Sequence, residues 1–256
     1  MLALAMALLA AGSLYALFAP QPQVATAQGD AALLAKGQEL YSNNCIACHG
    51  ANLQGVPDRG VSLIGVGDAA VYFQVSTGRM PLARQEAQAL RKPPLPVFDP
   101  ATPQGRQNLR ALGAFVAAHG GGPDRPEQSG AELVGDGVAR GAELFRLNCA
   151  SCHSYTGRGG ALLNGKYAPN LRAATPEQIY TAMLSGPQAM PRFGDRMLAQ
   201  EEKEDIIAYV LAVRGERNTP GGYSLGEVGP TAEGAVAWLV GLVALVVLTA
   251  WIGARS

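Results

Sequence analysis

A ten-residue segment occurs twice in this 256-residue chain, and both copies end at the start of a Cys-x-x-Cys-His motif. Residues 36–45 match residues 140–149 at a constant offset of 104 positions. The two motifs consist of Cys45, Cys48 and His49, and of Cys149, Cys152 and His153. A duplication of this kind predicts two structural units of one type. We place the first unit at 30–122 and the second unit at 123–217, with the Gly- and Pro-rich stretch 121–126 connecting them.

The motif is compatible with a thiol redox couple, half of a zinc site or covalent attachment of a haem. Thiol chemistry does not need the adjacent histidine. Zinc needs four ligands per site, and the one remaining histidine, His119, cannot complete two sites. A disulfide inside the motif would close a strained ring. Haem attachment uses all three residues, and the two motifs use all four cysteines of the chain. The sequence therefore predicts two covalently bound haem c groups, with His49 and His153 as proximal iron ligands.

A haem iron also needs a sixth ligand, and a Met-Pro pair after a Ser- and Gly-containing turn follows each motif. We predict Met80 for the first unit and Met190 for the second. Met183 and Met197 are rivals in the second unit, but Met183 lies at helical spacing with Ile179 and Tyr180, which favours a place in the core. Methionine–histidine ligation raises the haem potential.

Each proximal imidazole needs an acceptor for its second N–H group, because that bond fixes the orientation of the ring. The candidate in the second unit is the carbonyl of Pro169, and in the first unit it is the carbonyl of Val61. We interpret His119, which precedes three glycines, as a solvated residue at a helix end, with a ligand or proton-transfer role as the alternative.

Helical periodicity dominates both units and predicts a mainly α fold. Residues 31–43 form an amphipathic pattern with Asp30 as a possible N-cap, and 107–119 and 201–214 predict the closing helices. Gly37 and Gly141 would let the opening and closing helices cross tightly, with Phe115 and Tyr209 as the expected contacts. No window shows the sustained alternation that a sheet requires.

Both ends of the chain carry long uncharged runs. Residues 2–19 are apolar, and Ala25-Thr26-Ala27 resembles a cleavage site, so we interpret 1–27 as a signal peptide or an N-terminal membrane anchor. Residues 234–253 contain no charge and predict a transmembrane helix, reached through a linker at 218–233. Arg255, the only charge beyond it, places the C-terminus in the cytoplasm and both units outside.

The balance of charge excludes one class of function. The chain has 20 basic and 20 acidic residues, so it is not a nucleic-acid binder that works through bulk positive charge.

A proline-rich stretch at 82–100 adds length to the first unit, and four basic residues but one Glu lie between 79 and 92. This stretch is either a solvated loop or a docking surface near the haem edge.

Several strings resemble one known family. They are CIACHGANLQGVPD at 45–58, LIGVG at 63–67, VYFQVSTGRMP at 71–81, LFRLNCASCH at 144–153, PGGY at 220–223 and WIGARS at 251–256. They are similar to the dihaem cytochrome c subunit of the actinobacterial menaquinol–cytochrome c reductase, the cytochrome bcc complex, from about residue 20 onward. The sequence departs from that pattern in lacking a basic N-terminal segment and in having Val61 where a proline is expected.

The resemblance implies a fold of two tandem c-type cytochrome domains on a membrane anchor. It also implies the partners: a cytochrome b subunit, a Rieske iron–sulfur protein that donates electrons, and a copper-containing terminal oxidase that accepts them. The chain would then be an electron-transfer subunit with no catalytic activity of its own, with the first unit receiving electrons before the second.

Two other functions remain open from the residues alone. A dihaem peroxidase or thiosulfate-oxidising cytochrome would need an open iron position and a nearby acid or base, yet each motif here has its methionine and His119 is the only spare imidazole. A dihaem subunit of a different oxidase or of an alcohol dehydrogenase would also suit a membrane-anchored pair of cytochrome domains.

Overall fold

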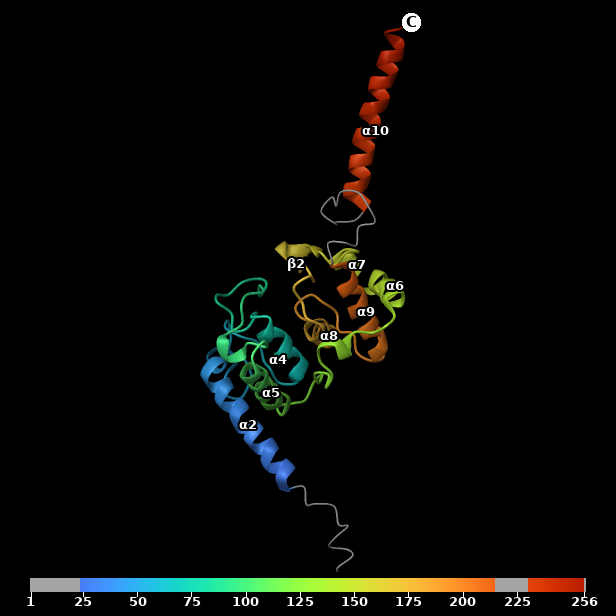
Figure 1. Ribbon diagram of the computed structural model, residues 1–256. Coiled ribbons are helices and arrows are strands. Elements are labelled where there is room, and N and C mark those ends of the chain that lie inside the picture. The colour runs from blue at the N-terminus through green and yellow to red at the C-terminus, as the bar shows by residue number, and fades with distance from the viewer. Residues whose placement is uncertain (1–23, 215–229, 256) are drawn as a thin grey trace, which may run out of the picture.

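The computed structural model describes residues 24–214 and 230–255, and it is mainly helical, as the sequence predicted. Two helical units follow one another along the chain, and a long C-terminal helix extends away from them (Figure 1). The elements of the first unit are α2 (Val24–Asn44), α3 (Ile46–His49), α4 (Gly67–Ser76), η1 (Pro96–Phe98) and α5 (Pro103–Ala117). Those of the second are η2 (Gly130–Leu133), α6 (Val138–Asn148), α7 (Ala150–His153), β1 (Gly160–Ala161), η3 (Leu163–Gly165), β2 (Tyr167–Ala168), α8 (Pro176–Ser185) and α9 (Gln200–Val213).

The opening and closing helices of each unit cross at a glycine. A Cβ atom on Gly37 would collide with the carbonyl oxygen of Ala111 on α5, and one on Gly141 would collide with the carbonyl oxygen of Asp205 on α9. Beside these crossings the ring centroids of Tyr41 and Phe115 lie 5.4 Å apart, and those of Phe145 and Tyr209 lie 5.2 Å apart. The predicted tight crossings and their aromatic contacts are therefore confirmed in both units.

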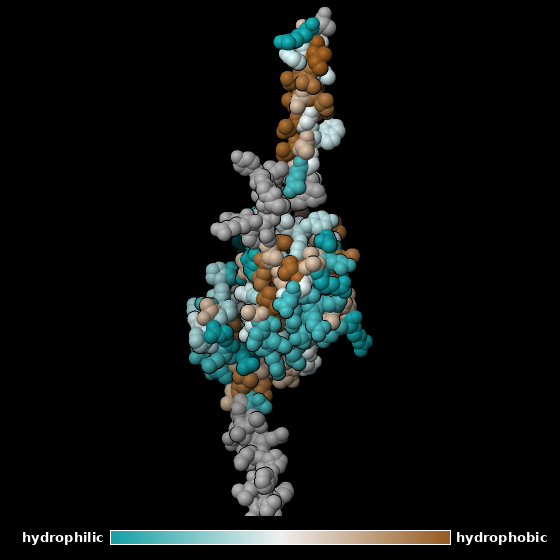
Figure 2. Space-filling view, turned by 45° about the vertical axis from the view of Figure 1, so that its right-hand side comes forward, coloured by the Kyte–Doolittle hydropathy of each residue, from teal (hydrophilic) through white to brown (hydrophobic). Residues whose placement is uncertain are grey.

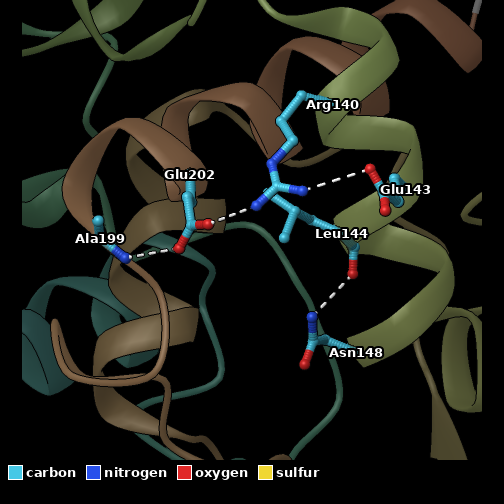
Figure 3. Close-up of polar contacts among 6 residues, drawn as sticks. All are labelled: Arg140, Glu143, Leu144, Asn148, Ala199 and Glu202. Atoms are coloured by element: carbon cyan, nitrogen blue, oxygen red, sulfur yellow. Dashed lines mark hydrogen bonds and ion pairs between the residues drawn. The ribbon is translucent and has the colours of Figure 1, made fainter.

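Polar contacts at the start of α6 and α9 fix the crossing in the second unit (Figure 3). Arg140 donates to Glu143 at 3.3 Å and to Glu202 at 2.9 Å. Glu202 in turn accepts from the backbone N–H of Ala199 at 3.0 Å, which caps α9. The first unit repeats part of this arrangement, because Lys36 pairs with Glu39 at 3.0 Å at the positions equivalent to Arg140 and Glu143.

Local sequence signals explain where two internal helices begin. Thr102 precedes Pro103 and accepts a hydrogen bond from the N–H of Gly105 at 3.0 Å, which caps α5. Thr175 precedes Pro176 and forms a capping box with Gln178 at the start of α8. A threonine cap followed by proline in the first turn is a favoured helix start, because proline has no N–H to leave unpaired.

The first helix begins earlier than predicted. The pattern placed it at 31–43 with Asp30 as the N-cap, but α2 starts at Val24, so Asp30 lies inside the helix. Residues 24–29 read Val-Ala-Thr-Ala-Gln-Gly and mix helix-favouring alanine with valine, threonine and glycine, so helix propensity does not mark this earlier start. A small two-stranded sheet, in which Gly160 pairs with Ala168 and Ala161 with Tyr167, is too short for any periodicity to reveal.

The connection between the units is bound along the first unit. His119 O accepts from the N–H of Gly65 at 3.1 Å, and Pro123 O accepts from the N–H of Ala69 at 3.0 Å. Arg125 then pairs with Asp68 at 3.2 Å and lies over the ring of Tyr72. Helices α4 and α8 pack against each other across the boundary. The two units therefore form one packed body.

The last helix, α10 (Pro230–Gly253), includes the stretch Thr231–Gly253, with a mean hydropathy of 2.5 and none of its most apolar window buried against the rest of the protein. Its apolar side chains are exposed along its visible length (Figure 2). By length and composition it can cross a membrane, as predicted for 234–253. Residues 1–23 of the predicted leader at 1–27, and 218–229 of the predicted linker, lie outside the described residues.

Candidate cofactor-binding sites

The first unit contains a hollow of about 1370 Å³, including space open to solvent, that we call the first hollow. Four of the residues predicted to carry chemistry line it together, namely Cys45, Cys48, His49 and Met80. Met80 also packs against the core of the unit, beside α4 and α5. Residues separated by more than thirty positions in the sequence are thus brought to one cavity.

The second unit contains an equivalent second hollow of about 1200 Å³, counted in the same way. Its lining includes the matching four residues, Cys149, Cys152, His153 and Met190. Of the two rival methionines, Met183 is 2% exposed in the core and also reaches the lining, while Met197 is 62% exposed and does not. Met183 thus packs in the core, as its helical spacing predicted, and the choice of Met190 as the sixth ligand stays a prediction.

One short helix in each unit aligns the motif. The backbone N–H groups of Cys48 and His49 donate to Cys45 O, at 3.2 and 3.0 Å, and the same bonds recur from Cys152 and His153 to Cys149 O, at 3.1 and 2.9 Å. Residues three and four positions apart on a helical turn lie on one face. The single turns α3 and α7 therefore present two thiols and one imidazole to the same side.

Backbone carbonyls orient both imidazoles. His49 Nδ1 donates to Val61 O at 2.7 Å, and His153 Nδ1 donates to Pro169 O at 3.1 Å, the two acceptors that the sequence predicted. Because a carbonyl oxygen can only accept, the proton resides on Nδ1 and the lone pair on Nε2 is available to a metal. Burial lowers the pKa of His153, which keeps this ring in the neutral form that binds metal.

The buried thiols are not poised for redox exchange. Burial, and to a lesser degree the neighbouring Cys48, raises the pKa of Cys45 to about 11. Burial and Cys152 raise the pKa of Cys149 to about 12. Thiol–disulfide enzymes need the opposite, a thiol with a lowered pKa. The raised pKa values of Cys45 and Cys149 therefore argue against dithiol redox chemistry in both units.

His119 lies at the end of α5, as predicted, but it is only partly solvated, and it lines neither of the two hollows. Its Nδ1 donates to Phe115 O at 2.7 Å, and its ring lies 4.7 Å from the ring of Phe115, so it closes the end of α5. It is half-buried, and its own carbonyl binds the N–H of Gly65.

The sequence reasoning missed that the first unit contributes to the second hollow. Four of its residues, Phe73, Arg79, Gln88 and Arg91, line that hollow beside Cys149 and His153. Three of the four, Arg79, Gln88 and Arg91, lie in the stretch that we interpreted as a solvated loop or a docking surface near the haem edge. The signal was therefore visible as a local excess of positive charge, but the sequence did not show that the charge turns inward.

Each hollow thus gathers two thiols, one oriented imidazole and one thioether, surrounded mainly by apolar side chains. A covalently attached haem uses this set of groups, with sulfur for attachment and an N and S donor for iron. The residues present fit two such cofactors.

Comparison with known proteins agrees with this chemistry. Residues 34–118 match the family described as "Cytochrome c", and residues 136–210 match "Cytochrome C oxidase, cbb3-type, subunit III". Cytochrome bc1 complex cytochrome c subunits are similar over nearly the whole chain. The protein of Mycobacterium bovis is 56% identical over 99% of this chain and 89% of its own length. Those of Mycobacterium leprae and Corynebacterium efficiens are 54% and 50% identical over all of this chain and 87% and 88% of their own lengths. With two cytochrome c-type domains and a C-terminal apolar helix, this chain belongs to the cytochrome c subunits of the cytochrome bc1 complex.

Proposed function

We propose that the chain binds two haem c groups, one in each hollow, and carries electrons between them. Cys45 and Cys48 attach the first and Cys149 and Cys152 the second. His49 and His153 are the proximal iron ligands, and Met80 and Met190 the sixth ligands. The observation that carries this proposal is the recurrence of the same four groups around two separate cavities, with both Nε2 atoms left available.

The haem irons, when bound, supply reversible one-electron chemistry, and this chain's residues set the conditions for it. The thioethers of Met80 and Met190 favour the ferrous state and raise the potential. The carbonyls of Val61 and Pro169 hold the imidazoles in place. With both axial positions filled by the protein, the chain is an electron-transfer subunit of quinol–cytochrome c reductase and has no separate catalytic activity.

The names of the relatives, which are subunits of a cytochrome bc1 complex, support a proposal about the partners. The chain assembles with a cytochrome b subunit and a Rieske iron–sulfur subunit of a menaquinol-oxidising complex, and it passes electrons to a terminal cytochrome c oxidase that contains copper. Helix α10 lies in membrane lipid, both haem-binding units face the extracytoplasmic side, and the C-terminus is cytoplasmic. The exposed apolar surface of α10 and the names of the relatives support the membrane anchor, and Arg255, the charge that follows the apolar run, supports the proposed orientation.

The order of the two units is the sharpest part of the proposal. The Rieske centre reduces the first unit, and the second unit, which precedes α10 in the sequence, reduces the oxidase. His49→Ala and His153→Ala test this order in the intact complex. Pyridine haemochrome spectra first establish that both variants retain two haems.

Stopped-flow reduction by a menaquinol analogue then separates the outcomes. In His153→Ala the first haem should be reduced normally while oxygen consumption stops. In His49→Ala the second haem should no longer be reduced at the wild-type rate. Prompt reduction of the second haem in His49→Ala would mean that the units work in parallel or in the opposite order. Rapid binding of cyanide or reaction with peroxide at both haems of the wild type would instead favour a peroxidase.

A further inference from the structure

The second hollow is lined by positive charge without a compensating acid. Its charged lining residues are Arg79, Arg91 and Lys166, and none of the residues that line it is Asp or Glu. The first hollow differs, because its lining contains one acid, Asp58, beside its one arginine, Arg59. A cavity with only cationic lining is suited to a ligand that brings its own negative charge.

Arg79 is the least exposed of these cations, and one of its nitrogens has no hydrogen-bond partner among the described residues. Its side chain belongs to a residue only 8% exposed, and its guanidinium lies 4.8 Å over the ring of Phe73. One terminal nitrogen, Nη1, is buried and has no hydrogen-bond partner among the described residues. A buried and unpaired guanidinium nitrogen costs free energy, so it points to an acceptor that the protein itself does not supply.

The backbone holds Arg91 beside Arg79. The N–H of Lys92 donates to Thr77 O at 3.3 Å, and its ammonium donates to the carbonyls of Gly78 and Pro81. Residues 78–81 and residue 92 therefore close the base of one loop. Burial, and then the nearby charge of Arg91, lowers the pKa of Arg79, as expected for a buried cation close to a second cation.

The same loop is anchored on the second unit. Gln88 exchanges two hydrogen bonds with the backbone of Tyr167 on β2, at 2.7 and 3.0 Å. Arg91 donates to Gln178 of α8 at 2.9 Å. Both Tyr167 and Gln178 line the second hollow. The two arginines are therefore positioned at this hollow by contacts on both sides of the boundary between the units.

We propose that Arg79 and Arg91 of the first unit bind the propionate carboxylates of the cofactor held in the second unit. The inference rests on the proposed function, since it requires a haem in the second hollow. A haem carries two carboxylates, and arginine binds carboxylates through paired N–H groups that also compensate the charge. The second unit is then not a self-sufficient cytochrome domain, because part of its cofactor site comes from the first.

Redox titration of the intact complex tests this proposal. A cation beside a haem stabilises the ferrous state, which carries one positive charge less than the ferric state, so its loss lowers the potential. Arg91→Gln should lower the potential of the second haem, and Arg79→Gln should lower it more, because Arg79 is buried and less screened. The component that belongs to the second haem is assigned from a parallel titration of Met190→Leu.

Further variants keep the test decisive. Arg84→Gln is the matched control, since Arg84 lies in the same loop, is 80% exposed and pairs with Glu86 outside the hollow, so neither potential should change. Arg79→Lys retains the charge, so it should shift the potential of the second haem less than Arg79→Gln does. This variant keeps the test informative if a glutamine buried at position 79 impairs folding. Resonance Raman spectra should show a changed propionate bending mode in the Arg79 and Arg91 variants alone.

The outcomes distinguish this inference from the proposed function. If pyridine haemochrome still reports two haems, yet the second haem keeps its wild-type potential and Raman spectrum in Arg91→Gln and Arg79→Gln, the arginines do not bind the propionates. A shift of the first haem equal to or larger than that of the second would also overturn the inference. If the second unit of the wild-type protein contains no haem, the proposed function itself is wrong.

Discussion

At the scale of single residues, the four cysteines divide cleanly between the two hollows, and this makes haem content a direct measure of the assignment. Each haem is attached by two thiols, so both must be removed to abolish attachment. Replacing Cys45 and Cys48 together by alanine should remove covalent attachment in the first unit alone, and replacing Cys149 and Cys152 together should do the same in the second. After extraction of non-covalent haem, the pyridine haemochrome assay should fall from two covalent haems to one. Two covalent haems remaining in either double variant would contradict the assignment.

The methionines give a second prediction at this scale. Met80→Leu and Met190→Leu preserve volume but remove the thioether, so each should leave one haem high-spin and lower in potential. Met197→Leu is the control in the second unit, because Met197 is 62% exposed and lies outside the second hollow. Absorption and EPR spectra of the ferric protein measure the spin state. An unchanged spectrum in Met190→Leu would transfer the role to Met183, which also reaches the hollow.

The site residues were predictable from sequence because the chemistry fixes their spacing. Two thiols and an imidazole on one helical turn must lie at positions i, i+3 and i+4, so the motif can be recognised from its spacing in the sequence. The roles of Arg79 and Arg91 could not be found in this way. No local pattern tells whether a cation faces solvent or another domain, since that depends on how α4 and α8 pack across the boundary.

At the scale of elements, the glycine at each helix crossing decides how closely the helices approach. Gly37→Ala and Gly141→Ala would each gain about 1 kcal/mol of helix propensity. The new methyl group, however, would collide with backbone oxygens, of Ala111 and Asp205, which cannot rotate away. Overpacking of this kind costs roughly 1–3 kcal/mol and occasionally more, so we expect a net loss of stability.

The measurement for these variants is thermal unfolding followed at the haem absorption band, because this band changes when the protein packed around a haem unfolds. Gly194→Ala serves as the control, since a Cβ atom there would meet nothing within 4 Å. We expect a lower unfolding temperature for Gly37→Ala and Gly141→Ala, and an unfolding temperature close to that of the wild type for Gly194→Ala. A stability equal to or above wild type in Gly141→Ala would show that α6 and α9 can separate at low cost.

Helices with a long amphipathic pattern were predicted well. Elements whose position depends on local propensity or on tertiary contacts were predicted poorly. The expected helices 107–119 and 201–214 appear as α5 and α9 with ends shifted by one to four residues. The start of α2 was missed by seven residues, because Asp30 resembles an N-cap and the residues before it carry no consistent helix signal. The strands β1 and β2 contact α7, and Tyr167 of β2 exchanges two hydrogen bonds with Gln88 of the first unit. These contacts join residues far apart in the sequence, so no short sequence window could predict the strands.

At the scale of the whole molecule, the two units behave as one body with a separate membrane helix. The connection between them is bound to the first unit through Gly65, Ala69 and Asp68, and the loop of the first unit is bound to β2 and α8. A fixed arrangement of this kind keeps the distance between the two hollows constant, which suits electron transfer along one chain better than two freely moving domains would. Helix α10 contributes nothing to either hollow.

The last prediction therefore separates anchoring from electron transfer. Residues 234–253 contain no Cys, His or Met, so α10 cannot bind or ligate a redox centre. A chain that ends before Glu233 should still bind two haems with unchanged spectra, because both hollows are formed by residues before 214. The truncated chain should no longer copurify with cytochrome b. Affinity purification of the cytochrome b subunit, followed by haem staining of a gel, measures this.

An unrelated apolar helix of equal length in place of 234–253 is the control that distinguishes a tether from a specific contact. Membrane attachment should return with either helix, since burial of about twenty apolar residues in the bilayer does not depend on their order. If α10 also packs specifically against cytochrome b, only the native helix should restore full copurification and quinol oxidase activity. Recovery of a complete and active complex with the truncated chain would show that the haem-binding units alone hold the subunit in place.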